Sequence, residues 1–545
     1  MGLTGHRIRS RAGSSASKAS SADEDSDTTV VEGDQGNVLG HIISQLRPGA
    51  DLSRVVLPTF ILEPRSMLER ITNFMSHPEM LLPIPEINDP IERFAAVVKF
   101  YLSGWHIRPP GVKKPLNPIL GEIFTCYWDL PDNTRAYYIS EQTSHHPPKS
   151  SYFYMVPDHH IRVDGTLKPR SKFLGNSAAS LMEGTAVLSL LNRGKNPKKG
   201  ERYILTQPNM YARGILFGKM KYELGDHSFV RCPELGLVAD IEFKTKGWVS
   251  GTYNAIGGTI RNEHTGEALF ELSGLWSDEM SIKDLRNGHK ETFFNGAKAK
   301  PSKPQVRPLE EQDERESQRL WAKTARAVKD KNHEVATDEK TKIEDMQREE
   351  AAKRGAENVE WHPRLFRAIR GGPGGEEEGE EELEWIINAH IDGHTPQAIT
   401  EQIMAIYPVI PGQKLSERNA IPPQHRNTAP APQVAPEDAQ ANLIDFESSE
   451  APAPAVAPTP ASAPAPVPAE APAVAAAAQN HPSQDSTEIR QMLSSTGHPT
   501  TGGPLIDFTG DVKNALPTTT QPTQPSHLRR TETEDSNDAF FDAHA

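Results

Sequence analysis

The sequence predicts a mainly β protein in which short antiparallel strands form one large barrel. Between about residues 110 and 290, apolar runs recur roughly ten residues apart, with Gly, Asn, Asp and Pro between them. No helical pattern alternates with these runs, which favours an antiparallel meander over a parallel sheet. A wide barrel leaves an interior that side chains alone do not fill. We therefore expect a cavity that holds a ligand.

Composition restricts the class of protein. The chain has 545 residues, a formal net charge of −14 and 36% hydrophobic residues. An acidic chain is a poor ligand for nucleic acid, so we expect no such partner. Cys126 and Cys232 are too few for a disulfide framework and indicate a reducing compartment. No apolar run reaches the length of a membrane span, so we expect a cytosolic protein that touches membranes peripherally.

Helices are expected before the strands. Residues 1–35 are poor in large apolar side chains and are predicted to be disordered. From Val38 to Leu46 apolar residues fall at helical spacing, so this segment either packs on the core or covers an opening near a membrane. Residues 66–75 have helical character. Asp89, with Pro90 after it, is a strong helix start.

After the barrel the pattern is helical from about 308 to 370. One helix is expected from Leu309 to Lys329, and a second from a cap at Thr337 to about Arg354. On the second, Lys340, Glu344 and Arg348 have i, i+4, i+8 spacing and share one face. By spacing alone this face is a solvated stripe of ion pairs.

The C-terminal third divides into three parts. Residues 371–384 are Gly-rich and then acidic, which is typical of a flexible insertion. Residues 385–415 regain apolar content and are expected to rejoin the domain. Residues 416–545 are rich in Ala and Pro and are predicted to be a disordered tail.

Three polar clusters carry the candidate chemistry. These are Lys114 with Asn117, the pair His145 and His146 within the run Glu141–Pro148, and the stripe on the second C-terminal helix. All three supply hydrogen-bond donors, which suit phosphate oxygens. Neighbours on a strand face opposite ways, so a simple His–His metal chelate is not expected. The set therefore predicts a receptor for a phosphorylated headgroup.

Catalytic patterns are missing from the sequence. It has no nucleophile elbow, phosphate-binding glycine loop or zinc spacing. Ser144 and His145 would form a nucleophile–base pair only in a geometry that sequence neighbours rarely adopt. We expect a protein that is not an enzyme and needs no cofactor or metal.

The run Glu141-Gln142-Thr143-Ser144-His145-His146-Pro147-Pro148 resembles the signature of the oxysterol-binding-protein-related lipid transfer proteins, and Lys114–Pro118 resembles their second motif. The resemblance covers about residues 36–415. It implies an incomplete antiparallel β-barrel around a lipid tunnel, a lid at about 38–65, and C-terminal helices. It also implies a site for phosphatidylinositol 4-phosphate, made of Lys114, Asn117, His145, His146, Lys340 and Arg348, with Glu344 in support.

The segment Gly49–Arg70, and Lys172–Ser177, resemble the branch of that family that carries phosphatidylserine. By this resemblance Leu57, Asn117 and Ser171 contact the serine lipid. The implied function is exchange of phosphatidylserine for phosphatidylinositol 4-phosphate between the endoplasmic reticulum and the plasma membrane at contact sites. A phosphoinositide sensor and a sterol exchanger are the alternatives.

The last residues resemble a motif of two phenylalanines in an acidic tract. Phe540, Phe541 and Asp542 follow acidic residues, and such motifs bind VAP adaptors of the endoplasmic reticulum. Ala539 stands where the motif usually has an acid. The alternative is an ordinary disordered terminus.

Overall fold

The computed structural model describes residues 28–30, 40, 42, 44, 46–52, 58–215, 219–247, 251–370 and 377–414. For residues 28–30 it describes the backbone only. Leu57 and the tail residues Phe540, Phe541 and Asp542, singled out above, lie outside these ranges, as does much of the expected lid. Within the stretch expected to form the first helix, Gly40, Ile42 and Ser44 are helical.

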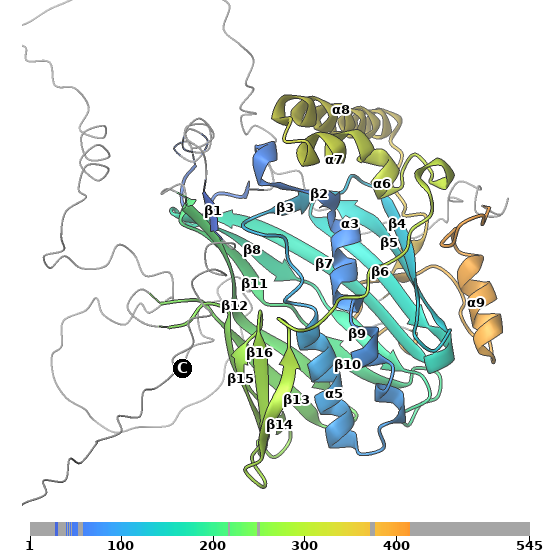
Figure 1. Cartoon of the computed structure of the whole chain (residues 1–545). Helices are drawn as coiled ribbons and strands as arrows, with labels where there is room; N and C mark the ends of the chain where they lie inside the picture. The colour runs from blue at the N-terminus through green and yellow to red at the C-terminus, as the bar shows by residue number, and fades with distance from the viewer. Residues whose placement is uncertain are drawn as a thin grey trace, which may run out of the picture. The chain divides into compact units, whose positions relative to one another are not determined.

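A sheet of 15 antiparallel strands dominates the fold, as predicted. Its main path runs β17-β16-β15-β14-β13-β12-β10-β9-β7-β6-β5-β4, and β1, β8 and β11 pair beside it (Figure 1). Among the described strands, β17 and β4 end the path without pairing to each other, so the barrel is incomplete. The strands are β1 Thr28–Val30, β4 Ile123–Asp129, β5 Arg135–His145, β6 Pro148–Val156, β7 Ile161–Phe173, β8 Ser177–Glu183, β9 Ala186–Leu190, β10 Glu201–Leu205, β11 Asn209–Arg213, β12 Lys219–Cys232, β13 Leu237–Lys244, β14 Ala255–Asn262, β15 Ala268–Leu275, β16 Glu279–Asp284 and β17 Lys290–Asn295.

The apolar runs in the barrel region fall largely on strands, but some strands have no such run. The strand β11 is half-buried at all five positions, whereas β8 has buried, half-buried and exposed positions. They pair with each other and with β12 and β7 at one end of the barrel. Because neither face of β11 is fully covered, it lacks the clear alternation that identifies a strand in sequence.

The N-terminal helices pack against the concave side of the sheet. They are α3 Met67–Arg70, η3 Ile71–Met75, α4 Pro78–Leu81, η4 Ile84–Glu86 and α5 Pro90–Ser103. As predicted, Asp89 caps α5, and its carboxylate accepts from the backbone N–H groups of Ile91 and Glu92 at 2.8 and 2.9 Å. Phe94, Val97 and Val98 of α5 are fully buried in the largest apolar cluster. The helix α5 therefore belongs to the main core of the barrel.

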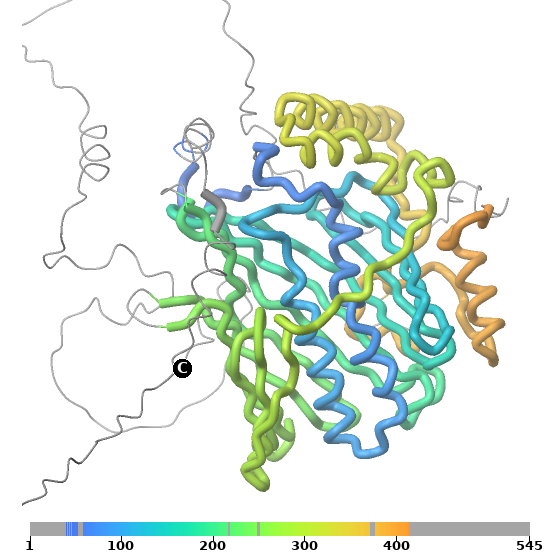
Figure 2. Tube along the Cα trace, viewed as in Figure 1, coloured from blue at the N-terminus to red at the C-terminus, as the bar shows by residue number. Residues whose placement is uncertain are grey.

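The chain after β17 covers an edge of the sheet. Figure 2 shows it running back across the N-terminal helices towards α6 (Ser317–Leu320). It pairs with β4 on the way, since Gln305 and Tyr127 exchange backbone hydrogen bonds of 2.7 and 3.0 Å. Covering an edge strand satisfies its backbone groups and prevents pairing with other chains.

The C-terminal helices differ from the prediction in two respects. The expected helix from Leu309 to Lys329 is divided into η7 Leu309–Glu311, α6 and α7 Ala322–Lys329. The long helix α8, His333–Glu357, begins before Thr337. Its cap is Asn332, whose side chain accepts from Val335 N at 3.2 Å, whereas Thr337 lies inside the helix and donates to the carbonyl of His333. The prediction that Thr337 caps this helix was wrong, because Asn332 supplies the capping oxygen one turn earlier.

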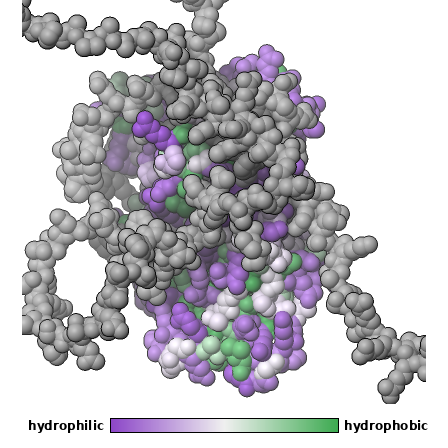
Figure 3. Space-filling view, turned by 90° about the vertical axis from the view of Figure 1, so that its left-hand side faces the viewer, coloured by the Kyte–Doolittle hydropathy of each residue, from purple (hydrophilic) through white to green (hydrophobic). Residues whose placement is uncertain are grey.

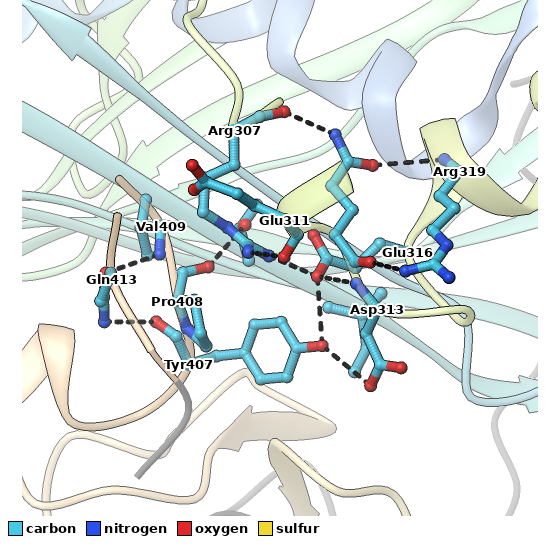
Figure 4. Close-up of polar contacts among 12 residues, drawn as sticks. Arg307, Glu311, Asp313, Glu316, Arg319, Tyr407, Pro408, Val409 and Gln413 are labelled. Carbon is cyan, nitrogen blue, oxygen red and sulfur yellow. Dashed lines mark hydrogen bonds and ion pairs between the residues drawn. The ribbon is translucent and has the colours of Figure 1, made fainter. Parts of the chain in front are cut away.

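A buried polar network ties the end of the described chain to the segment before α6. We call Arg307, Asp313, Glu316 and Tyr407 the C-terminal lock (Figure 4). Glu316 pairs with Arg307 and accepts from Asp313 N at 2.8 Å and from the Tyr407 hydroxyl at 3.4 Å. Burial raises the pKa of the Glu316 carboxyl. The lock fixes the segment after α9 (Pro396–Met404) beside the barrel.

The acidic segment is bound to the barrel wall where it is described. The sequence predicted a flexible insertion over 371–384, but residues 377–384 make ion pairs with cations of the outer wall. This segment leads into β19, Trp385–Ile387, which pairs with β18, Phe366–Ala368. The acidic pattern is explained by the basic residues that it contacts.

One face of the described chain shows a largely polar surface (Figure 3). In the face drawn in Figure 3, hydrophilic residues predominate and hydrophobic areas between them are small. Among the described helices, none has the length and apolar character needed to cross a bilayer.

Candidate functional site

A cavity of about 300 Å³ lies inside the sheet beside α3. Most of its wall is apolar and comes from α3, η3 and the inner faces of β7, β8, β11 and β12, for example Met67, Ile71, Phe74, Leu167, Met182 and Tyr222. Its other part is polar and is formed by the loop around β3 (Lys114–Leu116), the turn between β5 and β6, and α8. A pocket of this kind suits an amphiphile with a charged head.

The cavity brings together residues that are more than 200 positions apart in sequence. Of the residues singled out above, Lys114, Asn117, His145, His146, Ser171, Lys340 and Glu344 line it. We call Lys114, His145, His146 and Lys340 the basic cluster. Arg348 is not part of the lining. Its guanidinium contacts Asp345 and lies 4.0 Å from Glu344, and its side chain is 61% exposed.

The eight-residue run Glu141–Pro148 has two halves with different roles. The first half stabilises the hairpin of β5 and β6 from within. Ser150 donates to the side chain of Gln142 at 2.6 Å, and the hydroxyls of Thr143 and Ser151 lie 2.9 Å apart. Ser144 donates to the carbonyl of Pro147 at 2.7 Å, so its hydroxyl is directed away from a catalytic pairing with His145.

The second half places both histidines at the hairpin tip. His145 ends β5 and His146 lies in the turn before a cis peptide bond to Pro147. The two rings stand edge to face with centroids 4.5 Å apart, and both line the cavity. The expectation that the two side chains face opposite ways was wrong, because His146 lies in the turn rather than on the strand.

His145 is neutral at pH 7 in this environment. Burial, and then the neighbouring His146, lower the pKa of His145 to about 4. Its Nε2 atom lies 2.8 Å from the amide nitrogen of Gln347. An amide NH₂ donates, so this ring nitrogen accepts and carries no proton.

The lysines of the cluster repel each other. Burial, and then the ammonium of Lys340, lower the pKa of Lys114, while Asp51 acts in the opposite direction. Lys340 pairs with Glu344 at 2.6 Å. The two lysines therefore repel each other despite these carboxylates, and an anion in the cavity would relieve the repulsion.

Gln347, which the sequence motifs did not indicate, contacts the site from α8. Besides contacting His145, its carbonyl oxygen accepts from Leu120 N at 2.8 Å, so it joins α8 to the loop after Asn117. Gln347 follows Lys340 and Glu344 at i+7 and i+3, on the same helix face. That spacing is the signal that would have identified it.

A buried carboxylate, which the sequence motifs also did not indicate, supports the loop that carries Lys114 and Asn117. Glu122 is fully buried and accepts from Ile119 N at 3.1 Å and from the indole of Trp321 at 2.9 Å. The hydroxyls of Ser66 and Ser317 donate to it at 2.5 and 2.6 Å. Through these hydrogen bonds, Glu122 holds β2 (Leu62–Ser66), α6 and the loop in fixed positions relative to one another.

Two contacts attach the end of the expected lid to the site. Lys113 donates to the carbonyl of Phe60 at 2.6 Å, and Thr59 donates to the carbonyl of His333, the first residue of α8, at 3.2 Å. The short helix η2, Thr59–Ile61, is thereby held between the β3 loop and the helix that carries Lys340. Within the described chain, no group of three or more His, Cys, Asp or Glu side chains is placed to hold a metal ion.

Comparison with known proteins identifies the family. A family model described as oxysterol-binding protein matches residues 41–329. Oxysterol-binding protein homolog 6 of Saccharomyces cerevisiae is 50% identical over 430 residues, which cover 77% of this chain and 94% of the relative. Oxysterol-binding protein-like protein OBPalpha of Candida albicans is 50% identical over 398 residues, covering 73% and 91%.

A solved structure supports the fold. The Osh1 ORD domain in complex with cholesterol superposes with a TM-score of 0.54 at 22% identity, over 66% of this chain and 88% of that domain. At this identity the likeness concerns the fold alone. The extended match to the family model and the 50% identity to nearly full-length relatives show that this chain belongs to the oxysterol-binding protein family.

Proposed function

We propose that this protein exchanges phosphatidylserine for phosphatidylinositol 4-phosphate between membranes. The observation that carries the proposal is the charge of the cavity lining. Among the described residues, it contains the cations Arg70, Arg108, Lys113, Lys114 and Lys340, two histidines and one carboxylate, Glu344. Arg70 is already paired with Glu63, which does not line the cavity. An apolar tunnel with a positively charged end suits lipids with anionic heads, and both of these lipids are anionic.

The basic cluster is the proposed site for the phosphate groups of phosphatidylinositol 4-phosphate, with Asn117 beside it and Glu344 orienting Lys340. Arg348, outside the lining and paired with Asp345, would have to rotate to join them. Asn117 and Ser171 are proposed to contact the head of phosphatidylserine. Both line the cavity and offer donors and acceptors to its carboxylate and ammonium. Leu57 is proposed to pack on the lipid from the lid.

A two-liposome transfer assay tests the exchange. Donor vesicles contain phosphatidylserine, acceptor vesicles contain phosphatidylinositol 4-phosphate, and a fluorescent reporter follows each lipid. We expect the two lipids to move in opposite directions, and phosphatidylinositol 4-phosphate in the acceptor to accelerate delivery of phosphatidylserine. The variant His145→Ala/His146→Ala should lose this acceleration. Transfer of sterol with none of phosphatidylserine would contradict the proposal.

The same assay separates the exchanger from a phosphoinositide sensor. A sensor would hold phosphatidylinositol 4-phosphate, seen by native mass spectrometry of the purified protein, without moving either lipid between vesicles. A hydrolytic enzyme would alter the lipid on long incubation, and we expect it to be recovered unchanged.

The proposed sites of action are contacts between the endoplasmic reticulum and the plasma membrane, reached from the cytosol. A gradient of phosphatidylinositol 4-phosphate would drive phosphatidylserine towards the plasma membrane. The sequence motif at Phe540, Phe541 and Asp542 is proposed to bind a VAP adaptor. Binding of the wild-type tail, and its loss in Phe541→Ala, are the expected results of a pull-down.

A further inference from the structure

The histidine hairpin is held from outside the barrel by residues that do not touch the cavity. Glu141, on β5, is fully buried, and its two carboxylate oxygens accept from the backbone N–H groups of Arg364 and Leu365, each at 2.8 Å. On the other strand of the hairpin, Lys149 of β6 donates to Glu384 at 2.9 Å. Neither Glu141, Lys149 nor Glu384 is part of the cavity lining.

Both contacts come from one small unit, the pair of strands β18 and β19. Leu365 precedes β18 and Glu384 precedes β19, and the backbones of these flanking residues are linked. Asn388 N donates to the carbonyl of Leu365 at 2.7 Å, and Ile369 N donates to the carbonyl of Glu384 at 2.9 Å. Phe366 and Ile387 of this unit are buried against the outer face of β5 and β6. The unit therefore contacts both strands of the hairpin whose tip carries the histidines.

Glu384 makes the charged contacts between this unit and the barrel. One of its oxygens contacts Lys149 and the other contacts Lys168 of β7 at 2.5 Å. Lys149 follows Pro148, whose partner across the hairpin is His145. One residue, Pro148, therefore separates Lys149 from His145 across the hairpin. Partial burial opposes ionisation, yet the bonds from Lys168 and Lys149 keep the pKa of Glu384 below its usual value.

We infer that Glu384 is a positioning residue for headgroup recognition, which holds the tip of the β5–β6 hairpin where His145 and His146 line the cavity together with Lys114 and Lys340. The inference rests on the proposed binding of phosphatidylinositol 4-phosphate by the basic cluster. Glu384 acts through Lys149 and contacts no ligand. A recognition site needs such support, since small displacements of its donors weaken hydrogen bonds to the ligand.

The same segment provides a matched control. Glu381 also pairs with two cations of the outer wall, Lys199 at 2.9 Å and Arg202 at 2.7 Å. Arg202 lies on β10 and Lys199 lies just before it, so neither cation belongs to the histidine hairpin. Glu381→Gln removes the same charge and loosens the same segment without touching Lys149.

The test measures binding of dibutanoyl phosphatidylinositol 4-phosphate, a soluble probe, to the full chain by calorimetry. Glu384→Gln should weaken binding by about threefold to tenfold, as contacting residues in one network typically couple. Glu381→Gln should bind as the wild type does. The side-chain NMR signals of His145 and His146, recorded without probe, should shift in Glu384→Gln and not in Glu381→Gln. The thermal midpoints of the two variants should be similar.

The outcomes separate this inference from the proposed function. Wild-type affinity and unchanged histidine signals in Glu384→Gln would overturn the inference while leaving the proposed function standing. Equal losses of affinity in both variants would also overturn it, because they would indicate a general effect of loosening the segment. If the wild type fails to bind the probe, the proposed function fails, and the histidine signals still decide whether Glu384 positions the hairpin.

Discussion

The C-terminal lock and the basic cluster both gather charged side chains from distant parts of the chain, but they balance charge differently. In the lock, the buried guanidinium of Arg307 faces the buried carboxylate of Glu316, which also accepts two further hydrogen bonds (Figure 4). In the basic cluster, Lys114 faces Lys340, and burial together with this repulsion lowers its pKa.

The difference predicts that substitutions in the lock change stability, and that substitutions in the basic cluster change the proposed binding. A buried ion pair is strongly stabilised relative to either partner left alone. A cluster of like charges costs stability until an opposite charge arrives, and the fold holds it in place through neutral contacts such as that of Gln347 with His145. Substitutions in the two regions should therefore have opposite consequences.

The largest effect on stability is expected in the lock. Glu316→Ala leaves the guanidinium of Arg307 buried without its carboxylate, which typically costs about 3–5 kcal/mol. The free energy of unfolding, measured with urea, should fall by that amount. Glu310→Ala, at an exposed carboxylate in the same part of the chain, serves as the control and should change it little. A loss of less than about 1 kcal/mol in Glu316→Ala would show that the lock does not depend on this pair.

In the basic cluster the expected effect is on binding. Lys114→Ala removes a charged donor from the proposed phosphate site, and such hydrogen bonds contribute about 1.5–3 kcal/mol, or roughly 10- to 150-fold in affinity. The free energy of unfolding should stay the same or rise, because the repulsion with Lys340 is removed. Titration with the dibutanoyl phosphoinositide and urea unfolding give the two numbers, and Lys300→Ala, an exposed lysine, is the control. Lower stability together with unchanged affinity would make Lys114 a structural residue like those of the lock.

A smaller effect is expected from pH. Because the pKa of His145 is about 4 in the folded protein and its ordinary value is 6.5, the unfolded chain binds a proton more readily between these values. His145 therefore contributes a loss of stability as pH falls from 6.5 to 4. A phosphorylated ligand favours the protonated ring, so it should reduce this loss.

Burial also lowers the pKa of His106 to about 4, so His106 adds a pH dependence of its own. That contribution is the same in the wild type and in His145→Asn, and the difference between the two proteins therefore isolates the effect of His145. The difference in thermal midpoint between wild type and variant should depend on pH in this window, and the dependence should shrink with ligand. A difference that does not change with pH would show that His145 is not neutral in the folded state.

Local sequence patterns predicted much of the fold of this protein, and also its family. The spacing of apolar runs predicted the antiparallel sheet, the pair Asp89-Pro90 predicted the start of α5, and the run Glu141–Pro148 predicted the family that the comparisons then showed. Each of these signals lies within one segment, where spacing and residue type suffice. The spacing of Lys340 and Glu344 likewise placed them on one helix face, though it did not show that Arg348 turns to Asp345 instead of the cavity.

Pairings across long separations were decided by the tertiary structure. The contact of Gln347 with His145 joins residues 202 positions apart, and that of Glu384 with Lys149 joins residues 235 apart. The acidic run that ends at Glu384 is typical of a solvated insertion until the lysines that it contacts are known. Charge patterns identify residues able to form ion pairs, but only the folded chain brings a particular carboxylate to a particular ammonium. The same physical reason explains why the chain brings the basic cluster together at the cavity and binds the acidic segment to the barrel wall.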